Sequence, residues 1–167
     1  MQGKRVRESS ILTAQVMNPQ DANPAGNVHG GVIMKLIDTA AGAAAVKHSR
    51  ANCVTASIDR LDFHHPVFIG DLVTLRAGIT YTGKSSMEVG VRVEAENLLT
   101  GKTRHTVSAY MTFVALDTNG RPIAIPPLLL ETPEEQRRNR EAQARREARL
   151  REKTKEKACQ LDAETCD

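Results

Sequence analysis

A change in hydrophobic periodicity near residue 50 constrains the fold of this chain more than any other feature. Between about Gly30 and His48, apolar residues recur at the spacing of a helix with one buried face. From Asn52 onward, apolar and polar residues alternate with the period of two that is typical of half-buried strands. One long helix followed by a sheet is therefore predicted. The helical face expected in the core consists of Ile33, Leu36, Ile37, Ala40 and Ala44.

Four strands are predicted after this helix. The first runs from Asn52 to Phe63, and longer alternating runs follow at 73–82, 87–94 and 107–113. The short connections at 83–85 and 100–102 are rich in turn residues, which favours antiparallel hairpins. With 11–17 added as an edge strand, we predict an α+β fold in which an antiparallel β-sheet wraps a long central helix.

The second half of the helix is slim, because residues 40–45 are five alanines and Gly42. High helix propensity explains the alanines but not the glycine. An interior Gly costs up to about 1 kcal/mol relative to Ala, so we expect the sheet to approach closely there.

The composition changes from Glu131 onward to Glu, Arg, Lys, Gln and Ala. A proline-rich linker at 122–127 precedes this segment, and Thr132 to Glu135 reads as a capped helix start. We place a core domain at 1–127 and a charged helical extension and tail at 128–167, with the helix ending near Lys157. The helix has few apolar residues, so we expect it to be solvated or packed along a neighbouring subunit. Its arginines suggest RNA binding as an alternative, but interleaved glutamates cancel much of their field.

Length and composition limit the functional classes. The 167 residues suffice for one domain with an appendage, and no apolar stretch approaches the roughly 20 residues of a membrane span. Residues 1–10 are basic and polar without a following apolar segment, which predicts a soluble cytoplasmic protein. Cys53, Cys159 and Cys166 are an odd number without metal-ligand spacing, so reduced thiols are expected. A net charge of +3 does not imply nucleic-acid binding.

The helix entry carries the strongest indication of chemistry. His29, Gly30 and Gly31 should let another molecule approach the backbone, and the first N–H groups of a helix have no partner within it. Such an end suits an oxygen carrying negative charge. Asp38 lies two helical turns later, nearly over Gly31 and away from the apolar face. An alternative reading makes Asp38 a solvated acid beside an apolar stripe.

Two motifs need separate interpretation. Residues Gly78 to Ser85 fit the phosphate-binding pattern G-x-x-x-x-G-K-[ST], but that pattern requires a strand before and a helix after it. Here both flanks read as strands, so ATPase or GTPase activity is not predicted. His64 and His65 suggest a metal, but adjacent strand residues point to opposite faces and no third ligand is indicated. We predict no metal site.

Residues 17–38, 62–71 and 80–86 together resemble the hotdog-fold acyl-CoA thioesterases. The likeness is greatest to the bacterial cytosolic acyl-CoA hydrolases, whose animal relatives carry two tandem hotdog domains. It extends in order from about Ile11 to Pro127. The resemblance implies the hotdog fold, a long helix wrapped by an antiparallel sheet. It also implies dimers with active sites at the subunit interface, commonly assembled into homohexamers as trimers of dimers.

The resemblance places the catalytic Asn at Asn27 and the catalytic carboxylate at Asp38, facing each other from opposite protomers. Asp38 would activate water or attack directly, and the amide would orient the water or polarise the thioester. Gly31 N–H, aided by Gly30, would stabilise the oxyanion, with His29 in a positioning role. The turn expected to contact the nucleotide part of coenzyme A consists of Thr82, Gly83, Lys84, Ser85 and Ser86.

The predicted function is hydrolysis of acyl-CoA to a free fatty acid and coenzyme A. No metal or cofactor is expected, since coenzyme A is part of substrate and product. Neither nucleic acid nor membrane is an expected partner. Two alternatives remain open at this stage. A hotdog dehydratase acting on hydroxyacyl thioesters would use a His, for which His29 is the candidate. A non-catalytic acyl-CoA sensor would use the arginine-rich helix to reach a partner.

Overall fold

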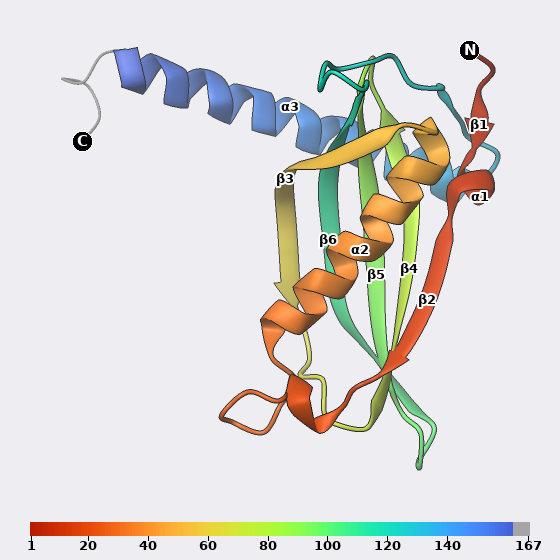
Figure 1. Ribbon diagram of the computed structural model, residues 1–167, viewed down its shortest axis with the longest axis vertical. Coiled ribbons are helices and arrows are strands. Elements are labelled where there is room, and N and C mark those ends of the chain that lie inside the picture. Colours follow the sequence, from red (N-terminus) through yellow and green to blue (C-terminus); the bar gives the residue numbers. More distant parts are fainter. Residues whose placement is uncertain (162–167) are drawn as a thin grey trace.

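The computed structural model describes residues 1–161, apart from the side chains of Arg60 and residues 157–161. A five-stranded antiparallel sheet has the order β2-β4-β5-β6-β3. The sheet curves around the helix α2 (Gly30–Ser49), which confirms the predicted wrapped-helix architecture (Figure 1). The strands are β2 (Ile11–Val16), β3 (Asn52–Phe63), β4 (Asp71–Thr82), β5 (Ser86–Asn97) and β6 (Lys102–Leu116).

Helix α2 packs its small residues closely on the sheet. Ala40, Ala41, Ala44 and Ala45 are at most 2% exposed, as the sequence predicts. At Gly42, however, a Cβ would lie 3.6 Å from the ring of Phe113, an ordinary contact distance. Space therefore does not require the glycine at this position, and the reason we inferred for it is wrong.

The hairpins follow the predicted connections. β4 pairs with β5 and β5 with β6, both antiparallel. Gly78 lies inside β4, and β5 begins directly after Ser85, so no helix follows the phosphate-binding pattern. That stretch is a strand and a hairpin turn, as predicted.

Four short elements were not predicted, one of them the 3-10 helix η1 (Pro19–Asp21) between β2 and α2. β1 (Lys4–Arg5) pairs in parallel with β7 (Leu128–Leu129), and α1 (Val6–Ser9) lies between β1 and β2. This segment is tied to the end of α2, because Lys4 Nζ donates to the carbonyl of His48 at 2.6 Å. The buried His48 ring bonds Ser9 through Nδ1 and the carbonyl of Pro126 through Nε2. The N-terminal segment, through Lys4 and Ser9, and the segment at Pro126 therefore both contact the C-terminal end of α2.

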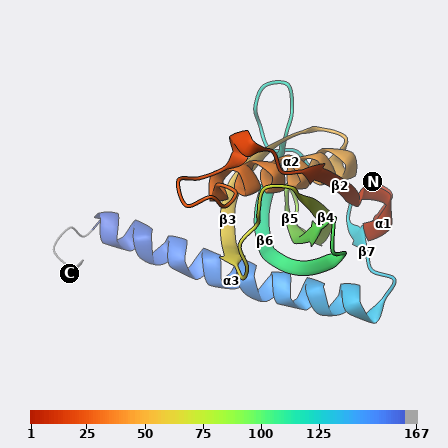
Figure 2. The same ribbon diagram turned by 90° about the horizontal axis from the view of Figure 1, so that it is seen from below.

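Helix α3 (Pro133–Leu161) lies across the outer face of the sheet, opposite α2 (Figure 2). Ala142 is fully buried, and Arg145 forms an ion pair with the buried Glu88 of β5. The expectation that this helix is solvated or held by a neighbouring subunit is thus wrong for its first half. Arginine contacts replace the apolar face that the helix lacks. Cys166 and the side chain of Cys159 lie outside the described residues.

Within the described residues, no helix is both long enough and apolar enough to span a membrane.

Candidate active site

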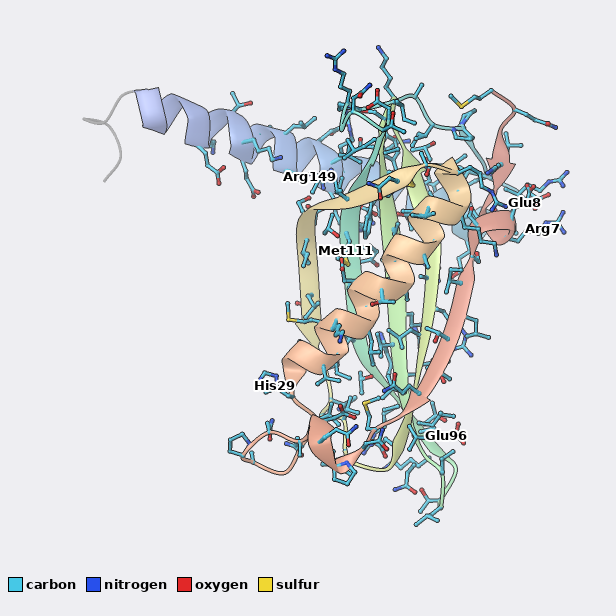
Figure 3. All side chains as sticks on the ribbon, in the orientation of Figure 1. Arg7, Glu8, His29, Glu96, Met111 and Arg149 are labelled. Carbon is cyan, nitrogen blue, oxygen red and sulfur yellow. The ribbon has the colours of Figure 1, made fainter. Side chains whose placement is uncertain are left out.

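His29 caps the start of α2, as Figure 3 shows at the lower end of the helix. Its Nδ1 accepts a hydrogen bond from Gly31 N–H at 2.9 Å. Because Nδ1 accepts, the proton of the neutral ring is assigned to Nε2. A Cβ on Gly31 would lie 3.1 Å from Nδ1, a tight contact that would require the His29 ring to shift by a few tenths of an ångström.

The cap changes which backbone donors are free. Gly31 N–H, the predicted oxyanion donor, is occupied by His29 in this structure. Val32 N–H donates to the carbonyl of His29 at 2.9 Å. Within the part of the chain that the structure describes, Gly30 N–H makes no hydrogen bond. Gly30 N–H is therefore available to an incoming oxygen without displacing a protein group, whereas Gly31 N–H is not.

Asp38 is exposed on the face of α2 that points away from the core. Thr55 Oγ1, from the edge strand β3, donates to Asp38 Oδ1 at 2.7 Å. This bond holds the carboxylate in one orientation while leaving Oδ2 open. Sequence analysis missed Thr55, because it lies on another element and no local pattern links it to Asp38.

Asn23 and Asn27 belong to one compact turn before the helix. Asn23 Oδ1 accepts from the backbone N–H groups of Ala25 at 2.9 Å and Asn27 at 3.2 Å. Asn23 N–H also donates to the carbonyl of Asn27 at 2.7 Å. The side-chain amide of Asn27 makes no hydrogen bond to any described residue. The turn projects from the end of the molecule at which α2 begins (Figure 1).

A single chain does not bring these groups together on one substrate atom. A rise of 1.5 Å per residue places Asp38 about 10 Å along the helix from Gly31. Among the described residues, no hydrogen bond or ion pair joins Asn23 or Asn27 to Asp38.

The turn predicted to bind coenzyme A lies at the opposite end of the sheet. Asn27 bridges to Phe68, just before β4 begins. The 12 residues of β4 then span roughly 35–40 Å before the turn at 83–85. Lys84 is exposed there, while Thr82 Oγ1 accepts the backbone N–H of Leu128 at 3.0 Å. Thr82 is thus at least partly structural.

The two histidines considered as metal ligands follow the end of β3. The rings of His64 and His105 lie 5.2 Å apart. His105 Nε2 also lies 3.0 Å from Ser108 Oγ. No group of three or more His, Cys, Asp or Glu side chains is placed to hold a metal ion in the described part of the chain.

Two open grooves flank α3, with volumes of about 640 and 530 Å³. Neither includes Asp38 or the helix entry among its lining residues. His29, Gly31 and Asp38 are themselves exposed, so the candidate active site faces solvent in the single chain and needs a further element to enclose it if water is to be controlled there.

The sequence matches the family model described as the thioesterase superfamily over residues 25–102. It is 40% identical over 129 residues to an uncharacterized acyl-CoA thioester hydrolase of Bacillus subtilis, YkhA, covering 77% of this chain and 75% of that protein. It is 37% identical over 140 residues to the cytosolic acyl coenzyme A thioester hydrolase of Rattus norvegicus. That match covers 83% of this chain but 36% of the rat protein.

Solved structures show the same fold. A hexameric acyl-CoA thioesterase, crystallised without ligand, superposes with a TM-score of 0.88 at 38% identity, covering 91% of this chain and 97% of that one. The acyl-CoA hydrolase of Staphylococcus aureus, in complex with butyryl coenzyme A and coenzyme A, also has a TM-score of 0.88. It is 34% identical and covers 96% of this chain and 98% of its own. Variants of that enzyme with an Asn, an Asp or a Thr replaced by Ala give similar structures.

Proposed function

Because the chain belongs to the thioesterase superfamily, with acyl-CoA thioester hydrolases among its relatives, we propose that it hydrolyses acyl-CoA at a site built by two subunits. The products are a free fatty acid and coenzyme A. The chain is an enzyme of the acyl-CoA hydrolase class with a hotdog fold.

The observation that carries the proposed mechanism is the bond from Thr55 to Asp38. An exposed carboxylate would otherwise sample several rotamers, but Thr55 fixes Oδ1 at 2.7 Å. The free Oδ2 can then take a proton from water, or attack the thioester carbon directly. Thr55 is a positioning residue in this scheme, and Asp38 is the catalytic residue.

A side-chain amide supplies the second function, the polarisation of the thioester or orientation of water. Asn27 is the residue that the family resemblance suggests, and its amide has no partner among the described residues. Asn23 is the rival candidate, on a spacing argument. In the Staphylococcus aureus hydrolase the substituted Asp lies fifteen positions after the substituted Asn and seventeen before the substituted Thr. Asn23, Asp38 and Thr55 have the same spacings in this chain.

The oxyanion is proposed to form at the start of α2. Gly30 N–H is open, and Gly31 N–H becomes available if the substrate oxygen displaces His29 Nδ1. The helix dipole adds a favourable field at this end. His29 therefore holds the entry in shape and does not act as the base.

Two chains are proposed to share each site. Asp38 is exposed in the single chain, and the turn with Asn23 and Asn27 projects from its end, so a partner's turn can reach it. The Lys84 turn lies roughly 35–40 Å from the helix entry of its own chain, so it would serve a site on another subunit. Hexameric relatives support a homo-oligomer, for which a trimer of dimers is the proposed arrangement.

Hydrolysis by this route needs only a base, hydrogen-bond donors and water, so we propose a reaction without metal or cofactor. Cytoplasmic location is also proposed, in line with the cytosolic rat relative.

The test is release of free thiol from saturated acyl-CoAs of increasing chain length. Asp38→Asn should lower turnover at least about 100-fold without loss of the oligomer, because it removes the base and keeps the shape. Glu147→Gln, at an exposed acid on α3, is the matched control and should leave turnover unchanged. Near-normal turnover by a folded Asp38→Asn protein would exclude this mechanism. Saturated substrates also separate hydrolysis from dehydration and from binding without turnover.

The two asparagines are distinguished by Asn23→Ala and Asn27→Ala in the same assay. The variant that loses turnover identifies the catalytic amide. Thr55→Ser should retain most of the activity that Thr55→Val loses, because only Ser preserves the hydroxyl donor.

A further inference from the structure

Helix α3 crosses the sheet one strand after another. Asn139 donates its side-chain amide to a backbone carbonyl of β4 at 2.7 Å. Arg145 binds the carboxylate of Glu88 in β5 through Nη2 at 2.8 Å. Arg149 then forms an ion pair with Asp59 of β3, the last strand of the sheet. The helix therefore reaches the free edge of the sheet at Arg149.

The helix does not end there. Twelve further residues, 150–161, continue α3 past β3, as both ribbon views show (Figures 1 and 2). At 1.5 Å per residue this segment extends about 18 Å, which equals the width of three to four strands at a spacing of about 4.8 Å. In the single chain, the first turns of this overhang still line a groove with β3, through Glu152, Lys153 and Glu156, and its far end lies beyond the sheet (Figure 2).

The edge that the overhang passes is open for pairing. β3 has 12 residues and a partner strand on one side only. Val54 and Ile58 on this strand are 42% and 46% exposed. An open edge of this length pairs readily with another strand, and a second copy joined there by two-fold symmetry extends the sheet beneath the overhang.

The groove between α3 and strands β3 and β6 is lined by more acidic than basic side chains, which suits a basic segment. It has a volume of about 640 Å³ and is lined by five acidic and three basic side chains. Of the acidic residues, Asp59, Asp62 and Glu141 lie outside segment 150–161, while Glu152 and Glu156 belong to that segment itself. Segment 150–157 carries four basic residues, Arg151, Lys153, Lys155 and Lys157, against these two glutamates, so it offers both signs of charge to the same segment of a second copy.

We propose that residues 150–161 form a strap that docks along this acidic groove on a second copy of the chain. The arrangement is reciprocal, because two-fold symmetry brings the two α3 helices side by side in opposite directions. Arg151 and Lys155 of one copy then face Glu152 and Glu156 of the other. The inference rests on the shared-site homo-oligomer of the proposed function, but it concerns what holds the subunits together.

Charge-swapped full-length variants test the strap. One variant carries Arg151→Glu with Lys155→Glu, and the other carries Glu152→Lys with Glu156→Lys. Each alone sets like charges against each other, so subunit exchange, measured by energy transfer between labelled copies, should accelerate about tenfold or more. An equimolar mixture of the two should restore slow exchange, because both contacts regain opposite charges.

Several readouts decide the outcome. Wild-type exchange rates in both single variants, or a mixture that stays fast, would overturn the strap. If exchange becomes slow only when RNA is added, the basic segment contacts nucleic acid, and this outcome would also overturn the strap. Thermal unfolding of each variant verifies that the fold is kept. Thiol release is measured in parallel, since an assembled wild type without turnover refutes the proposed function and leaves the strap standing.

Discussion

Replacing Arg145 by Met tests whether buried polar contacts hold α3 on the sheet. Nη2 and Nε of Arg145 donate to the Glu88 carboxylate at 2.8 and 3.1 Å, and the Glu88 side chain is 3% exposed. Thr80 donates its hydroxyl to the same carboxylate at 2.6 Å. The guanidinium also lies 3.7 Å from the centre of the Tyr110 ring. Loss of Arg145 therefore leaves a buried carboxylate without its counter-charge.

The expected loss follows from this burial. Removing one partner of a buried ion pair costs about 3–5 kcal/mol, and a domain of this size loses about 2–4 °C in Tm per kcal/mol. Arg145→Met should thus lower Tm by roughly 6–20 °C. The matched control is Arg137→Met on the same helix, whose pair with Glu141 is 54% and 42% exposed. That exposed pair should contribute less than about 1 kcal/mol.

The assay is thermal and urea unfolding at one fixed protein concentration, because an oligomer's apparent stability depends on concentration. Arg145→Met combined with Glu88→Leu should recover much of the loss, since no buried charge then remains unpaired. Equal losses from Arg145→Met and Arg137→Met would refute the argument. So would a double variant that is less stable than Arg145→Met alone.

Three more outcomes are expected. Lys84→Ala should raise KM for acyl-CoA and weaken the salt dependence of KM with little change in kcat, which is the pattern for a lost binding contact. A large fall in kcat with KM unchanged would instead give Lys84 a part in the chemical step. Mixing Asp38→Ala protein under exchange with the inactive asparagine variant, Asn27→Ala or Asn23→Ala, should restore thiol release, and proven exchange without activity would count against a shared site. Burial, with Lys4 adding a smaller effect, lowers the pKa of His48 below 6.5, so its neutral form is favoured in the fold. The free energy of unfolding should be fully retained above about pH 6.5 and decrease as pH falls toward the folded pKa, by up to about 1.4 kcal/mol per unit. Urea unfolding from pH 5 to 8 should show this decline in wild type and a flatter profile in His48→Gln.

The elements that the sequence predicts well are those whose signal is local. The period of the core helix and the alternation of β4, β5 and β6 are set by neighbouring residues, so each predicted run lies inside the observed element. The strands themselves extend further, and β6 begins at Lys102 where 107 was predicted. The docking of α3 was missed because it depends on Arg145 meeting Glu88, 57 positions away, and on Arg149 meeting Asp59, 90 positions away. A charged helix that stays in solvent can have the same composition, so the sequence pattern alone does not distinguish a docked α3 from a solvated one.

The candidate site shows the same limit. Glycines before a helix indicate free donors, but only the structure shows that His29 occupies Gly31 N–H and leaves Gly30 open. The contact between Thr55 and Asp38 likewise depends on the packing of α2 against β3. Both contacts depend on where a side chain points in the folded chain: His29 within the motif itself, and Thr55 on a strand 17 positions from Asp38.

The edge strand β3 connects chemistry with assembly. On the inner side of the sheet, Thr55 of β3 orients Asp38; on the outer side, Asp59 of the same strand binds Arg149, where α3 leaves the sheet. A second copy that pairs with β3 therefore meets the carboxylate and the strap together. Variants at this edge that block pairing should remove turnover at every concentration. Strap variants should instead lower turnover only on dilution, because they weaken assembly and leave each formed site intact.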